Sequence, residues 1–401
     1  MSSMTDLQSG PMSSIVVRAE KMAAGGDAIA RLPDGRVVFV RGALPGESVA
    51  IDVVQSKKDF ARAEVAEIVE PSTTRVEPPC PAYAAGCGGC TWQHVAPAGQ
   101  MELKAAVVTE ALRRTGKIAD PVVEVGSSVP PWAYRTTLRL AVDGDGFGLR
   151  RRTSHDIVEL DACPVSHPRL QDLLATMQVR GHGEFSLRVG DSSGERSAWV
   201  ADGDVELLDV PADVGVGPGA IVHENVAGCD LQVSAASFFQ SGPAAAELLV
   251  AAVREASSDL ADVDTVVDAY GGIGLFATMF ERARVIVVEG SSVACADAAA
   301  NLADRRAKVV HAQVEQWKPR HADLVIADPS RSGLGRTAVG VLTGTSARRI
   351  VLVSCDPVSL ARDAGLLRDS GYDHATSLVL DLFPQTHHVE VVTTFERRPD
   401  S

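Results

Sequence analysis

The chain has 401 residues, of which 45% are hydrophobic and 22% are charged. This composition is typical of a globular protein with two or three domains and excludes a disordered or fibrous chain. The formal net charge of −14 argues against a nucleic-acid partner, because phosphate contacts need Lys and Arg. However, residues 191–230 hold nine acidic residues and one arginine, so the acidity is concentrated in a stretch that can face away from RNA.

No membrane or export signal is evident in the sequence. The chain contains no apolar run near the roughly 18 residues that a spanning helix needs, and the N-terminal M-S-S-M-T-D lacks a signal-peptide core. The seven cysteines are odd in number and unevenly clustered, which in a reducing compartment favours metal or catalytic roles over disulfides. We expect a cytoplasmic, monomeric protein without a membrane partner.

Three regions follow one another along the chain. Residues 12–71 contain short alternating strands separated by Gly, Pro and Asp turns, which predicts a small β-barrel resembling an OB fold. Residues 72–240 combine a helix at about 98–115 with several strands and many turns, which predicts an α+β middle domain. Residues 241–401 alternate buried-looking strands with Ala-rich helices, which predicts a doubly wound, Rossmann-like α/β domain.

A glycine-rich loop opens the third region. Asp268 ends a strand, Tyr270 follows, and Gly272 and Gly274 form the turn before a helix; glycines let a backbone approach a ligand closely. Glu289 lies 21 residues after Asp268, at the end of the next strand, where a carboxylate can bind ribose hydroxyls. The loop lacks the third glycine of a dinucleotide motif, which favours S-adenosylmethionine as the cofactor.

Two further strand ends carry reactive side chains. Asp328 follows the strand A-D-L-V-I-A, and Cys355 follows R-I-V-L-V-S. Ligands of open parallel sheets bind outside the carboxyl ends of the strands, so Asp268, Glu289, Asp328 and Cys355 should gather at one edge. Glu390 precedes another apolar strand, 35 residues after Cys355. The cysteine is a candidate nucleophile and the carboxylate a candidate base.

Four other cysteines form a second constellation. Cys80, Cys87 and Cys90 lie within eleven residues, and Cys163 follows later in D-A-C-P-V. Thiolates ligate both zinc and iron–sulfur clusters, and the spacing alone leaves both open. Gly88 and Gly89 would let the loop wrap closely around such a group. Cys229 and Cys295 are interpreted as ordinary buried thiols.

With these residues in hand, the chain resembles a known family. It is similar to the S-adenosylmethionine-dependent RNA 5-methyluridine methyltransferases that carry an N-terminal TRAM domain and an iron–sulfur cluster. The likeness covers nearly the whole chain and includes F-V-R-G-A-L-P-G-E, C-G-G-C, Y-R-T-T-L-R, S-F-F-Q, D-P-S-R, V-S-C-D-P-V-S-L-A-R-D and D-L-F-P-Q-T-H-H-V-E. The last two are the most specific.

The resemblance implies a role for each matching position. Cys355 is the implied nucleophile and Glu390 the general base. The implied cofactor contacts are Gln240, Tyr270, Gly272, Gly274, Glu289, Gln313 and Asp328. Substrate contacts are implied for Phe238, Asp328, Arg135 and Arg139, and the ligands of a four-iron cluster for Cys80, Cys87, Cys90 and Cys163. Four positions depart from the family pattern. Asp356 replaces a usual Asn beside the cysteine, Gln313 replaces an acidic or Asn residue, Gly271 replaces a common Cys, and Gly242 replaces a common Asn after S-F-F-Q.

This chemistry explains why a cysteine and a carboxylate are needed. Carbon 5 of uracil is a poor nucleophile until a thiolate adds to carbon 6; a base must then remove the carbon 5 proton so that the thiol can leave. A single-stranded target enters such a pocket at low cost. Large-subunit ribosomal RNA is the favoured substrate and the T-loop of transfer RNA the alternative. A methyltransferase for cytosine or DNA, and a non-catalytic RNA-binding protein, are the other classes considered.

Overall fold

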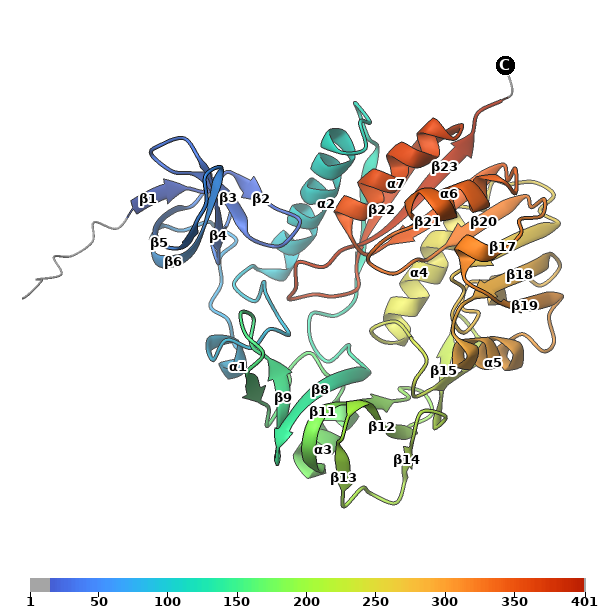
Figure 1. The fold of residues 1–401 in the computed structure, drawn as a ribbon, viewed down its shortest axis with the longest axis horizontal. Helices are drawn as coiled ribbons and strands as arrows, with labels where there is room; N and C mark the ends of the chain where they lie inside the picture. Colours follow the sequence, from blue (N-terminus) through green and yellow to red (C-terminus); the bar gives the residue numbers. More distant parts are fainter. Residues whose placement is uncertain (1–14, 400–401) are drawn as a thin grey trace, which may run out of the picture. The chain divides into compact units, whose positions relative to one another are not determined.

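The computed structural model describes residues 15–399, which form two compact units (Figure 1). The first unit comprises residues 15–77 together with 94–96, and the second comprises residues 78–93 together with 97–399. Between residues 15 and 399, no helix combines the length and the apolar character needed to cross a membrane.

The first unit is a curled sheet of six short strands, drawn in blue (Figure 1). Its strand order is β1-β5-β6-β4-β3-β2, and every pair is antiparallel except β4 with β6. Alternate residues such as Val38 and Val40 are fully buried, as the period of two along a strand requires. The strands are β1 (Ile15–Arg18), β2 (Lys21–Met22), β3 (Ala28–Arg31), β4 (Val37–Arg41), β5 (Ser48–Ser56) and β6 (Phe60–Glu70). The predicted barrel began at residue 12, and residues 12–14 lie outside the described part.

A second sheet of seven strands occupies the middle of the chain, and a β15–β16 hairpin follows it. The strands of this sheet are β8 (Thr137–Gly144), β9 (Gly146–Arg150), β10 (Ile157–Glu159), β11 (Gln178–Val189), β12 (Arg196–Gly203), β13 (Glu206–Leu208) and β14 (Val214–Val216). The hairpin consists of β15 (Ile221–Val226) and β16 (Cys229–Ser234). Helix α1 (Pro81–Ala84) precedes these strands in the sequence, and helix α3 (Pro168–Thr176) lies between β10 and β11. The acidic stretch 191–230 therefore lies on β12 to β16 and their connections.

The C-terminal sheet has eight strands in the order β19-β18-β17-β20-β21-β23-β22-β7. Its strands are β7 (Val123–Ser128), β17 (Thr265–Ala269), β18 (Arg284–Glu289), β19 (Ala307–His311), β20 (Leu324–Ala327), β21 (Arg349–Ser354), β22 (Tyr372–Asp381) and β23 (Glu390–Arg397). Strands β17 to β21 are parallel, and β23 is antiparallel to both of its neighbours.

Helices cover both faces of this sheet, which confirms the predicted doubly wound α/β fold (Figure 1). Adjacent strand residues belong to different cores: Val351 packs with α4, whereas Leu352 packs with α6 and α7. The helices are α4 (Pro243–Glu255), α5 (Ser292–Asn301), α6 (Gly335–Thr343) and α7 (Pro357–Asp369), with 3-10 turns η1 (Ala277–Met279) and η2 (Val314–Gln316).

One helix and one strand lie in a different part of the fold from the one predicted. The sequence assigns α2 (Pro97–Arg114) and β7 to the middle region, 72–240. In the structure β7 pairs in parallel with β22, and Val108 and Leu112 of α2 are buried in one core with Leu360 and Leu367 of α7. The amphipathic period of α2 predicts the helix but not the sheet against which its apolar face packs.

Candidate active site

A pocket of about 690 Å³ opens at the carboxyl edge of the C-terminal sheet. Glu390 begins β23, and Ser354 at the end of β21 lies opposite Val391. The antiparallel strand therefore brings its first residue to the edge where the parallel strands end. The predicted site residues that line the pocket are Arg135, Phe238, Gln240, Tyr270, Gly272, Glu289, Asp328, Cys355 and Glu390.

Three residues that were predicted to contact the cofactor or the substrate do not line this pocket. Gly274 has a φ of +85°, and an added Cβ would lie 2.9 Å from the side chain of Leu302, so a tight turn explains this glycine. Gln313 precedes η2, with its side-chain amide against the backbone of Gly290. Arg139 is exposed on β8 and forms an ion pair with Glu184.

Two carboxylates accept hydrogen bonds from backbone N–H groups of the glycine-rich loop and so fix its conformation. Asp268 is fully buried and accepts a hydrogen bond from the backbone of Ala277 at 3.1 Å. Burial and then the charge of Asp328 raise the pKa of Asp268 to about 8. Glu289 accepts from the backbone N–H of Gly272 at 2.9 Å and of Ser291 at 2.7 Å. Glu289 thus faces the pocket with its orientation fixed, while Asp268 supports the loop.

The predicted nucleophile and base share the pocket with Asp328. Burial raises the pKa of the Cys355 thiol to about 12, and the charges of Glu390 and Asp328 act in the same direction. Burial and Asp328 raise the pKa of Glu390, and burial raises the pKa of Asp328 to about 7. Arg331 opposes the shifts of Cys355 and Glu390. Burial therefore disfavours the thiolate of Cys355 and the ionised forms of both carboxyl groups, and each ionisation disfavours the others.

Asp356, which departs from the family pattern, is the N-cap of α7. Its side chain accepts hydrogen bonds from the backbone of Val358 at 3.0 Å and of Ser359 at 2.7 Å. Asp and Asn are equivalent in this capping role. The charges that act on Cys355 come from Glu390, Asp328 and Arg331, so the carboxylate of Asp356 serves the helix start.

The segment that carries Phe238 and Gln240 is fixed by a buried carboxylate from α5. Phe238 is 70% exposed at the pocket, so it is not a core residue. Asp297, which is 1% exposed, accepts hydrogen bonds from the hydroxyls of Ser234 at 2.8 Å and Ser237 at 2.6 Å. The sequence analysis did not identify Asp297, because a buried Asp in an Ala-rich helix gives no signal of its partners.

Further residues without a predicted role line the pocket, and three of them are Arg331, Phe383 and His388. A guanidinium nitrogen of Arg331 lies 3.0 Å from Nε2 of His388. Burial and neighbouring positive charges lower the pKa of His388 to about 3, so its imidazole is neutral. All three lie within D-P-S-R or D-L-F-P-Q-T-H-H-V-E, the segments that carried the family resemblance.

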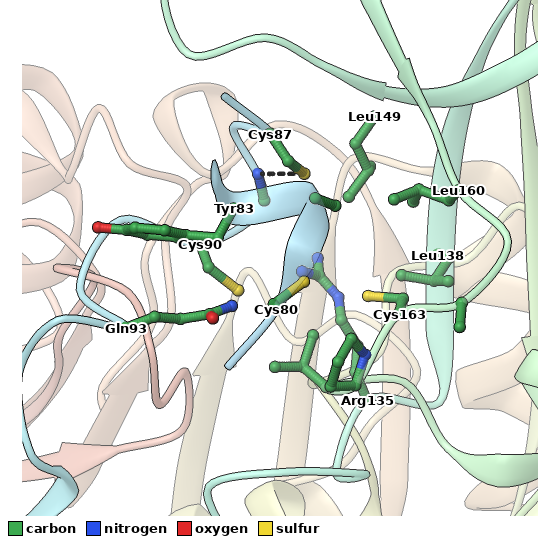
Figure 2. Close-up of a pocket in the computed structure, with 15 residues that line it drawn as sticks. Cys80, Tyr83, Cys87, Cys90, Gln93, Arg135, Leu138, Leu149, Leu160 and Cys163 are labelled. Carbon is green, nitrogen blue, oxygen red and sulfur yellow. Dashed lines mark hydrogen bonds between the residues drawn. The ribbon is translucent and has the colours of Figure 1, made fainter. Parts of the chain in front are cut away.

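The four predicted cluster ligands surround a smaller cavity in the middle of the chain. Cys80, Cys87, Cys90 and Cys163 are buried, free of disulfides and line this cavity, and Figure 2 shows their sulfur atoms turned into it. Cys87 Sγ accepts a hydrogen bond from the backbone of Gly89 at 3.4 Å. Arg135 lines both this cavity and the larger pocket.

The donor set of this cavity fits a thiolate-ligated group, because four buried sulfurs converge on it beside apolar residues such as Leu138, Leu149 and Leu160. The four sulfurs line one cavity, but within residues 15–399 no three His, Cys, Asp or Glu side chains are close enough together to hold a metal ion. Burial is the largest cause that raises the pKa of Cys90 to about 12.

Comparison with known proteins adds evidence that is independent of the geometry. Residues 15–66 match the TRAM domain model. A Streptomyces avermitilis protein described as an RNA methyltransferase is 35% identical, over 94% of this chain and 96% of its own length. The 23S rRNA (uracil(1939)-C(5))-methyltransferase RlmD of Aeromonas salmonicida is 32% identical, over 90% and 92% respectively.

A solved structure shows the same fold. The tRNA (uracil-54, C5)-methyltransferase of Pyrococcus abyssi, in complex with S-adenosyl-L-homocysteine, superimposes with a TM-score of 0.73 at 24% identity. The match covers 96% of this chain and all of the other. With the near-complete coverage of its relatives and the TRAM match, these findings show that the chain belongs to the S-adenosylmethionine-dependent RNA uracil-C5 methyltransferases that carry a TRAM domain.

Proposed function

We propose that the protein methylates carbon 5 of a uridine in 23S ribosomal RNA through a covalent intermediate on Cys355, with Glu390 as the base. The observation that carries this proposal is the meeting of the ends of β21 and β23, which puts the thiol and the carboxylate in one pocket with Glu289 and Gln240. The 23S RNA preference rests on the RlmD relatives. A monomeric, cytoplasmic enzyme would keep its seven thiols reduced.

The cofactor end of the pocket is formed by Gln240, Tyr270, Gly272 and Glu289. Glu289 retains free lone pairs on both oxygens for ribose hydroxyls, since each oxygen accepts one backbone hydrogen bond. S-adenosylmethionine, when bound there, supplies an electrophilic methyl group on a positively charged sulfur. That positive charge favours the Cys355 thiolate, whereas burial and the charges of Glu390 and Asp328 disfavour it.

The reaction then needs the two protein groups in sequence. The thiol of Cys355 releases its proton to solvent and its sulfur bonds to carbon 6, which moves the electron pair of the carbon 5–carbon 6 double bond into an enolate. Carbon 5 would then attack the methyl group of a bound S-adenosylmethionine, whose methyl–sulfur bond would break to release S-adenosyl-L-homocysteine. Glu390 removes the proton from carbon 5, the double bond re-forms, and the carbon–sulfur bond breaks to return the thiolate. Phe238, exposed at the pocket mouth, offers a ring face for the unstacked base.

Replacing the two catalytic residues separates the two halves of this reaction. Cys355→Ala cannot add to carbon 6 and should show neither methylation nor a covalent adduct. Glu390→Gln keeps the nucleophile but cannot remove the carbon 5 proton. It should accumulate a methylated protein–RNA adduct that survives denaturing electrophoresis and forms only when S-adenosylmethionine is present.

The second part of this experiment tests which RNA is the substrate. The same assay is run with a 23S ribosomal RNA fragment and with a transfer RNA transcript of matched concentration. Faster adduct formation on the ribosomal fragment supports the proposal, whereas adduct on transfer RNA alone would assign the enzyme to the T-loop. Normal turnover by Glu390→Gln would show that another group is the base, and turnover by Cys355→Ala would exclude covalent catalysis.

The cysteine cavity is the second part of the proposal. Cys80, Cys87, Cys90 and Cys163 would hold a four-iron, four-sulfur cluster that shapes the RNA-binding middle region and does no redox work. Protein purified without oxygen should be brown, with about four irons per chain, and Cys87→Ala should lack both. Cys229→Ala, which changes a cysteine outside the cavity, is the matched control. Stoichiometric zinc with no iron would replace the cluster by a structural zinc site.

A further inference from the structure

The loop between β22 and β23 carries pocket residues and leads directly to Glu390. Phe383 and His388 of this loop line the pocket. Between them, Gln385 is 2% exposed and has a φ of 69°, a left-handed conformation that a residue other than glycine adopts only when its surroundings enforce it. The loop is therefore held in place by contacts from outside itself.

Much of this restraint comes from the residues just after Cys90. The backbone N–H groups of Thr91 and Trp92 both donate to the carbonyl of Gln385, at 3.0 and 2.9 Å. The hydroxyl of Thr91 accepts from the backbone N–H of His387 at 3.1 Å and lies 3.0 Å from Nδ1 of the same residue. One short segment thus contacts both the strained residue and the first of the two histidines.

The Thr91 hydroxyl also fixes the orientation of the His387 ring. A hydroxyl carries one proton and two lone pairs, so it can accept the backbone N–H and still form a hydrogen bond with Nδ1 in either tautomer of the imidazole. The two contacts together hold the backbone and the side chain of His387 on one oxygen. The ring centroid of His387 lies 4.3 Å from that of His388, so the orientation of the first ring limits that of the second, which lines the pocket.

We propose that Thr91 is a positioning residue for the reaction: its hydroxyl fixes His387, and through it the placement of His388 and of the loop that leads to Glu390. This inference rests on the proposed role of Glu390 as the base. Because Thr91 follows Cys90 in the chain, the peptide that borders the cysteine cavity is also the one that restrains the catalytic loop.

The test compares two substitutions at this position, made in the full chain purified without oxygen. Thr91→Val preserves the shape of the side chain and removes the hydroxyl, whereas Thr91→Ser keeps the hydroxyl. Thr345→Val is the matched control, because Thr345 is fully buried and its hydroxyl bonds to the backbone of Leu342, outside the pocket. Single-turnover methylation, the KM for S-adenosylmethionine, iron content and hydrogen exchange of residues 382–389 are measured for each.

Thr91→Val should lower the single-turnover rate about ten-fold, the size expected for one lost hydrogen bond. Hydrogen exchange of the loop should accelerate, while the KM for S-adenosylmethionine and the iron content match those of the wild-type protein. Thr91→Ser should restore most of the rate, and Thr345→Val should leave rate and loop exchange unchanged.

Three outcomes would overturn the proposal. They are an unchanged rate and loop exchange in Thr91→Val, no recovery in Thr91→Ser, or loss of iron in Thr91→Val, which would place the residue's role in the cysteine site. Failure of the base assignment is recognised separately, from normal turnover of Glu390→Gln with wild-type Thr91. In that case the faster loop exchange of Thr91→Val would still be observed.

Discussion

The protons of Cys355, Asp328 and Glu390 are linked within one pocket. Each negative charge disfavours the next ionisation, because the three groups are close together and shielded from water. The neighbouring His388 is neutral, and its pKa is lowered to about 3 by burial and then by surrounding cationic groups. A low pKa makes the His388 imidazole a weak base, which supports the proposal that a carboxyl group removes the proton from carbon 5.

The pH dependence of the reaction follows from this linkage. A raised carboxyl pKa keeps the group protonated, and unable to act as a base, until the pH exceeds that pKa. Burial raises the pKa of Asp328 to about 7, and burial and Asp328 together raise that of Glu390, so single-turnover rates should keep increasing with pH above the range in which ordinary carboxyl groups titrate.

Asp328→Asn removes a negative charge that raises the pKa of Glu390. The acid limb of the pH–rate profile should then shift to lower pH, even though the maximal rate falls because an amide replaces the carboxyl group that is proposed to contact the cofactor and the uracil. Asp356→Asn is the control, since the Asp356 carboxylate caps α7, and its profile should match that of the wild-type protein. An acid limb that stays in place in Asp328→Asn would show that the limiting ionisation belongs elsewhere.

At the scale of elements, helix α2 also contacts the loop of residues 382–389 that precedes Glu390. Lys104 is fully buried in α2, and its Nζ lies 2.6 Å from Asp381 and 3.3 Å from the carbonyl of Phe383. Gln100, one turn earlier, accepts from the backbone of Gln385 at 2.8 Å. A helix assigned by sequence to the middle region thus holds the loop that precedes Glu390.

Removing the charge of Lys104 should destabilise the whole second unit. Lys104→Met leaves Asp381 as a buried, unpaired carboxylate, so the free energy of unfolding should fall by about 3–5 kcal/mol. The double variant Lys104→Met/Asp381→Leu should recover much of that loss, because neither charge is then buried. Denaturant unfolding followed by circular dichroism measures both.

Arg114→Met is the control on the same helix. Its ion pair with Glu110 spans 3.7 Å, and the arginine side chain is 71% exposed, so its loss should cost less than about 1 kcal/mol. An equal effect of Lys104→Met and Arg114→Met would show that the buried pair contributes no more than a surface pair.

Over the whole molecule, local patterns predicted more than long-range arrangement. Buried runs such as 349–354 identified the parallel strands, and the turn signals identified the strand ends that carry Glu289, Asp328 and Cys355. Nothing in the sequence near 123–128 indicates that β7 joins β22. Pairing between segments this far apart depends on the shape of the assembled sheet, which a sequence pattern with a period of 2 or 3.6 does not encode.

The same distinction between local patterns and long-range contacts applies to the residues of the candidate site. Residues at strand ends or in family motifs were identified, whereas those that act by supporting others, including Thr91, Lys104 and Asp297, were not. A threonine after a cysteine or a buried lysine in a helix is unremarkable until the partner is known. Gln313 and Gly274 show the converse, since a matching motif position does not guarantee a place in the pocket.

The hydrogen bond between Thr91 and His387 joins residues 296 positions apart, and this separation has a consequence for folding. Contacts of such long range close large loops and are expected to form late. In a chain that has folded only in part, Cys355 could be in place while the loop of residues 382–389, and with it Glu390, is not. The Cys355 thiol would then lack the Glu390 carboxylate that turnover needs, so incompletely folded molecules should not methylate RNA. Methylation activity would therefore report completed folding of the second unit.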